Sequence, residues 1–266
     1  MESGDTVFTG SIPEYYDRCL GPFLFEPYAE DLATRAVDLA PRNILEVAAG
    51  TGIVTAALAR ALPEAEIVAT DLNPDMLRVA EGKGAGPRLT FRPADAQALP
   101  FPDSAFDLVV CQFGAMFFPD RIAAYREALR VLRPGGTYLL NVWDRLEANP
   151  ASQTLADSVA SLFPEDPPSF LARVPFGYHD KARIEADLRV AGFESVESET
   201  IAKRSRGAAG EVAPGLCQGS PLRAEIEARA PGRLEEATEA AVAALVRRHG
   251  DPVDAAMSAH VFAARR

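Results

Sequence analysis

The sequence is short of cysteine and of basic residues. Its three cysteines, Cys19, Cys111 and Cys217, lie far apart and form no CxxC or metal-ligand spacing, so we expect reduced thiols, no disulfide framework and no metal site. Lysine and arginine total 27 against 38 aspartates and glutamates, which gives a formal net charge of −11. Because nucleic-acid binding depends on basic residues that neutralise phosphates, this balance argues against DNA or RNA as a partner.

Long apolar runs and a secretion signal are also missing. No stretch approaches the roughly 18 uninterrupted apolar residues of a membrane span, so no span is predicted. The N-terminus carries Glu2 and Asp5 where a secretory signal carries basic residues, and we therefore expect a cytoplasmic protein. The length of 266 residues, with 48 % hydrophobic and 24 % charged residues, predicts one soluble core with insertions.

From Asn43 onward, short apolar runs alternate with segments of helical period, which is typical of βαβ units and a parallel sheet. Asn73 and Pro74 open one predicted helix as its cap and first-turn proline. Another helix, over residues 119–132, is stopped by Pro134-Gly135-Gly136. The five strands predicted here cover residues 44–47, 67–70, 89–92, 106–111 and 138–143.

The regular alternation of strand and helix patterns ends after Asp144. A helix to about Phe163, a proline-rich run and an irregular segment through His179 predict a cap insertion. The core pattern returns with a helix over residues 181–191 and a strand over 196–201, and two helices between 220 and 248 precede a last strand over 259–263. The basic run at 203–206 is interpreted as a solvated loop.

A glycine-rich turn, Ala48-Ala49-Gly50-Thr51-Gly52, follows the first predicted strand. Glycine lets the backbone approach a ligand closely, and ligands of parallel sheets bind outside the carboxyl ends of the strands. Asp71 ends the second strand about twenty residues later, where a carboxylate can accept both ribose hydroxyls of an adenosine. That spacing also fits NAD, but the NAD fingerprint G-x-G-x-x-G is replaced from Ala48 by A-A-G-T-G-I, which disfavours an NAD-type oxidoreductase.

Four segments in this order carry a family resemblance: residues 44–52, 70–77, 95–107 and 131–136. They resemble the class I S-adenosylmethionine-dependent methyltransferases, in particular the small-molecule group with the ubiquinone and menaquinone C-methyltransferases. The resemblance implies a Rossmann-like, doubly wound, mostly parallel seven-stranded sheet with an antiparallel last strand. The single domain is expected to divide into N-terminal lid helices (1–42), a cofactor core (43–144), a cap (145–179), further core (180–202), a helical insertion (203–255) and the last strand (256–266).

The resemblance also implies a binding site for S-adenosylmethionine. Glu46 would support the loop, Asp71 would hold the ribose, and Asp95 with Ala96 would contact the adenine edge. Ala48 stands where the family often has glycine, which leaves open both a slight displacement of the loop and the contact of Ala48 with the cofactor. The predicted cofactor-binding residues are Tyr16, Glu46, Ala48, Ala49, Gly50, Thr51, Gly52, Asp71, Leu72, Met76, Asp95, Ala96, Gln97, Gln112 and Phe113.

Several of these residues have a second interpretation. Tyr16 belongs to an aromatic-rich segment that is expected to close over the cofactor, or else to pack a terminal helix onto the core. Met76 and Phe113 are open to plain core packing as well.

Methyl transfer from a sulfonium is an in-line displacement, so the enzyme chiefly aligns the reactants and excludes water. A general base matters only when the acceptor arrives protonated. His179 in the cap is the predicted base, with Asp144 and His249 as alternatives, although a lone histidine is often structural. His260, in the last strand, is interpreted as structural.

The acceptor is expected to be a small molecule. Phe113, Met116, Phe117 and Phe118 follow the fourth strand and either line an apolar acceptor site or staple the next helix to the sheet. The first interpretation favours a quinone, phenolic, polyketide-like or lipid-like acceptor. O-, N- and C-methylation, monomer and homodimer all stay open, as does an S-adenosylmethionine-binding protein with another purpose, such as cyclisation or regulation.

Overall fold

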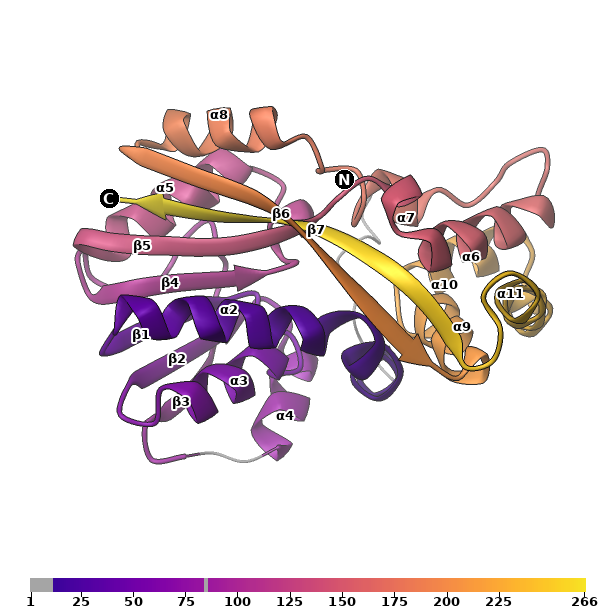
Figure 1. The fold of residues 1–266 in the computed structure, drawn as a ribbon, viewed down its shortest axis with the longest axis horizontal. Coiled ribbons are helices and arrows are strands. Elements are labelled where there is room, and N and C mark those ends of the chain that lie inside the picture. Colours follow the sequence, from indigo (N-terminus) through magenta and orange to yellow (C-terminus); the bar gives the residue numbers. More distant parts are fainter. Residues whose placement is uncertain (1–11, 84–85) are drawn as a thin grey trace.

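The computed structural model describes residues 12–83 and 86–266. Seven strands form one sheet in the order β3-β2-β1-β4-β5-β7-β6 (Figure 1). The first five strands run parallel, and β7 pairs antiparallel with both β5 and β6, which confirms the predicted fold class. The strands are β1 (Asn43–Val47), β2 (Glu66–Asp71), β3 (Leu89–Pro93), β4 (Phe106–Gln112), β5 (Leu132–Trp143), β6 (Ser195–Gly207) and β7 (Val253–Arg265).

Helices cover both faces of the sheet because the side chains of its central strands alternate between two apolar cores. Leu108 and Val110 of β4 pack toward α2 (Glu26–Leu39) and α3 (Ile53–Ala61), whereas Val109 and Cys111 face the larger core. That larger core lies under α5 (Arg121–Val131) and α8 (Lys181–Ala191), which contact each other. The helix α4 (Pro74–Gly82) follows β2, and its N-terminus is capped by the side chain of Asn73.

The remaining helices form a second layer beyond the end of the sheet. We call this layer the cap; it is larger than the cap predicted over residues 145–179, because helices from other parts of the chain belong to it. The helix α11 packs on both α6 and α9, and α9 packs on the π-helical segment η1. Within the described residues, no helix is long and apolar enough to cross a membrane. The elements of this layer are α1 (Ile12–Tyr15), η1 (Tyr16–Phe25), α6 (Pro150–Ser161), α7 (Phe170–Arg173), α9 (Ala209–Gln218), α10 (Leu222–Arg229) and α11 (Leu234–His249); two short 3-10 turns, η2 (Ala115–Phe117) and η3 (Leu146–Ala148), follow β4 and β5.

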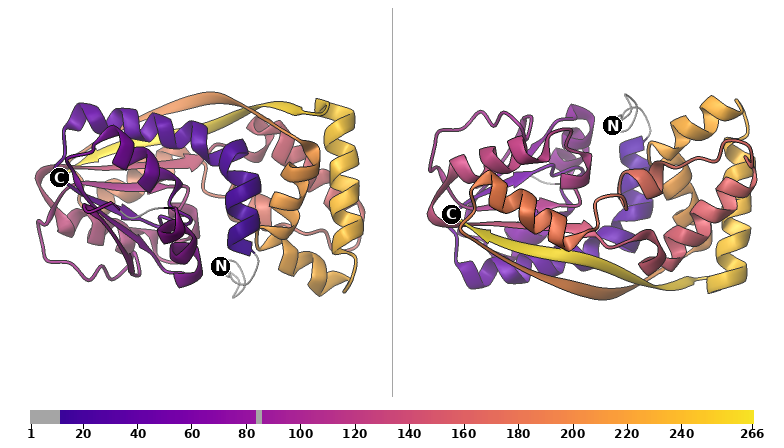
Figure 2. Two further views of the ribbon diagram at one scale, coloured as in Figure 1. Left: turned by 90° about the horizontal axis from the view of Figure 1, so that it is seen from below. Right: turned by 90° about the horizontal axis from the view of Figure 1, so that it is seen from above.

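The strands β6 and β7 are much longer than predicted. They continue past the end of β5 and carry the sheet toward the cap, as Figure 2 shows. The predicted solvated loop at 203–206 is therefore wrong, since these residues pair with 254–257 and Ser205 points inward. Both strands also cross the domain boundaries predicted near residues 202 and 256.

The four-residue α7 lies in the segment predicted to be irregular, and the longer helix α9 was not predicted either. Its sequence contains Gly210, Pro214 and Gly215, which disfavour a helix locally. Packing against η1 stabilises the helix and explains why residue 215 is glycine. A Cβ added at that position would lie 2.6 Å from a methyl carbon of Leu20. Tertiary packing overrides local propensity at this point.

Candidate functional site

A cavity of about 570 Å³ opens at the carboxyl ends of β1, β2, β3 and β4. This is the edge at which parallel sheets bind ligands. The structure brings most of the predicted cofactor residues to its wall: Tyr16, Ala48, Gly50, Asp71, Leu72, Met76, Asp95, Ala96, Gln97, Gln112 and Phe113.

The loop between β1 and α3 keeps a glycine-like backbone although Ala48 is not glycine. Ala48, Gly50 and Gly52 have φ of 55°, 57° and 78°, all in the left-handed region. Gly114, which follows β4, leaves room for the Ala48 methyl group, since a Cβ at position 114 would lie 2.5 Å from it. Gly52 allows α4 to pack closely against the loop, because a Cβ added at position 52 would lie 2.8 Å from the Cβ of Ala80.

Asp71, the last residue of β2, binds the loop on one side and α4 on the other. One of its carboxylate oxygens accepts the N–H of Gly50 and the other accepts the N–H of Asn73, each at 2.8 Å. Burial raises the pKa of Asp71, although the backbone donors at Asn73 and Gly50 oppose the shift. The carboxylate is thus fixed in direction at the wall of the cavity.

Four predicted cofactor residues lie behind this wall. Glu46 is 1 % exposed and accepts a 2.6 Å hydrogen bond from the hydroxyl of Thr55 in α3. Its burial raises its pKa to about 8, and the nearby charge of Asp71 adds to the shift. Ala49, Thr51 and Gly52 are buried as well and do not line the cavity. Contact between these four residues and a cofactor stays a prediction.

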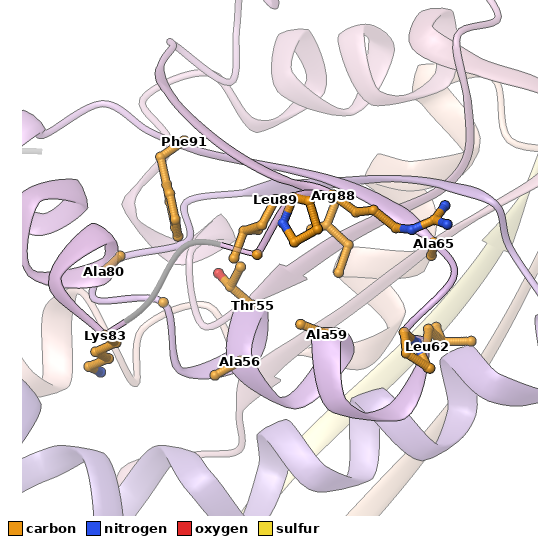
Figure 3. A pocket seen from close by; sticks show the side chains of 15 residues that line it. Thr55, Ala56, Ala59, Leu62, Ala65, Ala80, Lys83, Arg88, Leu89 and Phe91 are labelled. Carbon is orange, nitrogen blue, oxygen red and sulfur yellow. The ribbon is translucent and has the colours of Figure 1, made fainter.

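A second cavity of about 330 Å³ lies behind the loop, between α3, α4 and β3 (Figure 3). Of the predicted site residues it contains only Gly52, and small apolar side chains such as Ala56 and Ala59 make up much of its wall. The charged groups at its rim are engaged elsewhere: Lys83 pairs with Asp17, and Arg88 pairs with Glu64 and Glu66. The candidate cofactor site is therefore the cavity at the carboxyl ends of the strands, which most of the predicted residues line.

Asp95 and Gln97 build the part of the wall that follows β3. Asp95 Oδ1 accepts the Gln97 N–H at 2.8 Å, and Gln97 Oε1 accepts the N–H of Asp120 at 2.9 Å. The other carboxylate oxygen of Asp95 makes a long contact, 3.5 Å, with the Gln97 amide. A weakly engaged acceptor oxygen thus lies beside the buried apolar side chains of Ala96 and Met76.

Aromatic rings form another part of the wall. Tyr16, Phe113, Phe117 and Phe118 line the cavity, whereas Met116 is fully buried and does not. The ring of Phe113 stacks on Trp143 of β5, with centroids 3.8 Å apart and planes at 4°. Phe113 thus serves both interpretations that the sequence left open, since it packs in the core and also faces the cavity.

The segment η1 closes one side of the cavity. Tyr16 stacks on Phe25 at 4.8 Å, and the Gln112 amide donates to the Phe25 carbonyl at 3.1 Å. Burial, together with the negative charges of Asp71 and Asp17, raises the pKa of Tyr16 well above its usual range. The phenol is therefore neutral at physiological pH.

None of the three predicted general bases reaches the cavity wall. His179 is exposed, and its Nδ1 is hydrogen-bonded to the carbonyl of Phe176 at 2.8 Å within the turn after α7. Asp144 accepts the Ser258 hydroxyl at 2.8 Å and pairs with His260 at 3.3 Å. His249 lies 2.9 Å from the Thr154 hydroxyl at the end of α11.

Six further residues line the cavity without having been predicted. Gly114 is a glycine directly after a central strand, and Asn73 with Pro74 begins the helix after Asp71; both are signals that were available in the sequence. The others had no distinguishing pattern. The six residues are Val47, Asn73, Pro74, Ala94, Gly114 and Pro119.

Comparison with known sequences agrees with this geometry. A family model described as a methyltransferase domain matches residues 44–136. The demethylmenaquinone methyltransferase of Deinococcus radiodurans is 35 % identical over 161 residues, covering 59 % of this chain and 65 % of that protein. The ubiquinone/menaquinone biosynthesis C-methyltransferase UbiE of Escherichia coli is 32 % identical over 170 residues, covering 59 % of this chain and 68 % of that protein. The chain thus spans slightly less than two thirds of the Deinococcus protein.

A solved structure shares the fold over the whole chain. It is phosphoethanolamine N-methyltransferase 2 of Haemonchus contortus in complex with S-adenosyl-L-methionine. The TM-score is 0.63 at 17 % identity, covering 100 % of this chain and 60 % of that one.

Proposed function

This chain belongs to the class I S-adenosylmethionine-dependent methyltransferases, and from that premise we propose that it methylates an apolar, ring-containing small molecule. One observation carries the proposal. A single cavity joins the carboxylates of Asp71 and Asp95 to an aromatic wall formed by Tyr16, Phe113 and Phe117. Polar recognition of a nucleoside and apolar recognition of a second ring thus lie side by side.

The donor set fits the cofactor of this family, S-adenosylmethionine. The two oxygens of Asp71 accept backbone N–H groups, and the carboxylate, which has about four acceptor sites, retains capacity for a ribose hydroxyl. The weakly engaged oxygen of Asp95 can accept an adenine amino group, and Met76 with Ala96 supplies apolar surface for the base. Gln112 lies where the methionine portion would follow.

The chain's own residues would align the reactants. When bound, S-adenosylmethionine supplies a methyl group on a sulfonium that is open to in-line attack. The loop and η1 hold the cavity wall, and the rings of Phe113 and Phe117 exclude water from the acceptor side. Because Tyr16 stays a neutral phenol, we assign it a hydrogen-bonding or packing role and not that of a base.

The first test is ligand binding. A ligand that binds only the native state raises the melting temperature by mass action, so S-adenosylhomocysteine should raise it and NAD should not. The second test is methyl transfer from labelled S-adenosylmethionine to a panel of hydroquinones and phenols, with polar amines for comparison. Stabilisation by NAD alone would overturn the cofactor assignment, and transfer to polar amines alone would overturn the acceptor class.

A further inference from the structure

Asn141 in β5 is a fully buried polar residue that contacts two residues of the cavity wall. It lies opposite Gln112 in the β4–β5 register. Its side-chain Oδ1 accepts the N–H of Phe113 at 3.1 Å, and its Nδ2 donates to Oε1 of Gln112 at 3.4 Å. One amide side chain therefore fixes both residues that leave β4 for the cavity.

Phe113 needs such a contact because its backbone is strained. Its φ of 50° is left-handed, a conformation that bulky residues rarely adopt and that persists only where the surroundings enforce it. The N–H is shared between the backbone and side-chain oxygens of Asn141, each at 3.1 Å. The ring is held by the stack on Trp143 and by an edge contact with Tyr28. The ring held in this way lines the cavity.

We propose that Asn141 is a positioning residue for methyl transfer, an inference that rests on the proposed function. It acts through Gln112 and Phe113, which it holds at the end of the cavity where cofactor and acceptor would meet. Gln112 also donates to the carbonyl of Phe25, so the same hydrogen-bond chain extends from β5 to η1. Loss of the Asn141 side chain would leave the Phe113 N–H bonded to the Asn141 backbone carbonyl alone and the Gln112 side chain bonded to the Phe25 carbonyl alone.

A merely structural role is the competing explanation, and Asn149 offers a matched control for it. Asn149 is 3 % exposed, and its side chain accepts the N–H of Ser258 at 3.0 Å and donates to the Ser258 carbonyl at 3.1 Å. It does not line the cavity. The two asparagines share residue type, burial and backbone anchoring, and they differ in what they hold.

The experiment compares Asn141→Leu with Asn149→Leu. S-adenosylhomocysteine affinity is measured by calorimetry, together with the ligand-induced change in fluorescence of Trp143, the only tryptophan in the chain. We expect Asn141→Leu to weaken binding about five- to tenfold, the scale of one misplaced hydrogen bond, and to reduce the fluorescence response. Asn149→Leu should keep both properties even where it lowers stability.

A conservative variant keeps the test decisive if Asn141→Leu fails to fold. Asn141→Asp retains the acceptor for Phe113 but loses the donor to Gln112, so its affinity should lie between wild type and Asn141→Leu, with Asn149→Asp as control. Equal effects at positions 141 and 149, or no effect at 141, would overturn the inference. Failure of the wild-type protein to bind S-adenosylhomocysteine would overturn the proposed function itself, and this inference with it.

Discussion

An aspartate stands at the carboxyl end of β2 and another directly after the carboxyl end of β5, and the two have different roles. Asp71, at the end of β2, accepts two backbone N–H groups and faces the cavity. Asp144, just after β5, accepts the Ser258 hydroxyl and the Arg145 N–H and pairs with His260. Topology alone thus does not make a binding residue; what matters is whether the partners leave the carboxylate open to a ligand.

The pKa values differ in the same sense. Burial raises the pKa of Asp71 despite its backbone donors. Burial also acts on Asp144, but the hydrogen bonds from Ser258 and Arg145 and the adjacent His260 outweigh it, so its pKa is lowered. The β2 end keeps a destabilised, accessible carboxylate, whereas the carboxylate after β5 has its partners within the protein, two of them in β7.

The largest expected effect separates the two aspartates directly. Asp71→Ala should weaken S-adenosylhomocysteine binding by roughly 1.5–3 kcal/mol, the scale for hydrogen bonds to a charged group. Asp144→Ala should leave affinity within about twofold but lower the free energy of unfolding by about 1–3 kcal/mol, because Ser258 and His260 lose a partner. Calorimetry and urea unfolding measure the two quantities, and equal losses of affinity would break the comparison.

The next effect concerns the wall around the β2 end. Gly114→Ala should destabilise the protein by about 1–3 kcal/mol, because the new Cβ would meet Ala48 and the sulfur of Cys111. Adding Ala48→Gly should recover part of this loss. Gly210→Ala is the control, since a Cβ added at that position would have no neighbouring atom within 4 Å among the described residues. Urea unfolding of Gly114→Ala, Ala48→Gly, the double variant and Gly210→Ala measures the effect, and strictly additive energies for Ala48 and Gly114 would argue against the contact.

A pH series distinguishes the two ends by the sign of their proton linkage. The folded pKa of Glu46, about 8, lies above its usual 4.5, so the folded state keeps a proton that the unfolded state loses. Stability from this group is complete below pH 4.5 and is lost as pH rises toward 8. His260, near the β5 end, has the opposite sign, because burial lowers its pKa below 6.5 and stability is lost as pH falls below that value.

Glu46→Gln should therefore remove the loss of stability between pH 4.5 and 8 and leave the His260 contribution unchanged. Urea unfolding across this range measures the slope. An unaltered slope in the variant would show that Glu46 is ionised in the folded protein.

The smallest expected effect tests the backbone of the loop. Ala48→Gly should change stability by less than about 1 kcal/mol, because relief of the left-handed strain offsets the greater freedom of the unfolded chain. Ala49→Gly, at a residue without positive φ, should cost about 0.5–1 kcal/mol. Thermal unfolding of both variants decides the point, and an equal cost at the two positions would contradict the strain argument.

The β2 end was predictable from sequence because its signals are local. The first strand, the glycine turn, Asp71 and the Asn73 cap follow one another within one βαβ unit and the start of the next helix, and most residues predicted from them line the cavity. The structure around the carboxyl end of β5 was not predictable, because it depends on contacts between residues far apart in the sequence. The pairing of residues 203–206 with β7 and the packing of Gly215 against Leu20 leave no local pattern.

The predicted general base shows in the same way that local sequence does not reveal contacts made in the folded protein. A histidine in the predicted cap suggested catalysis, but His179 is exposed and absent from the cavity wall, and its Nδ1 is hydrogen-bonded within its own turn to the Phe176 carbonyl. Asn141 is the reverse case, since an asparagine within an apolar strand gave no sign that it contacts two residues of the cavity wall.

The most direct measurement is a crystal structure of the protein with S-adenosylhomocysteine. The account predicts the ribose hydroxyls within hydrogen-bond distance of the Asp71 carboxylate, the adenine beside Asp95 and the sulfur directed toward Gln112 and Phe113. A ligand bound in the cavity between α3 and β3, or one that leaves Asp71 without a contact, would contradict it.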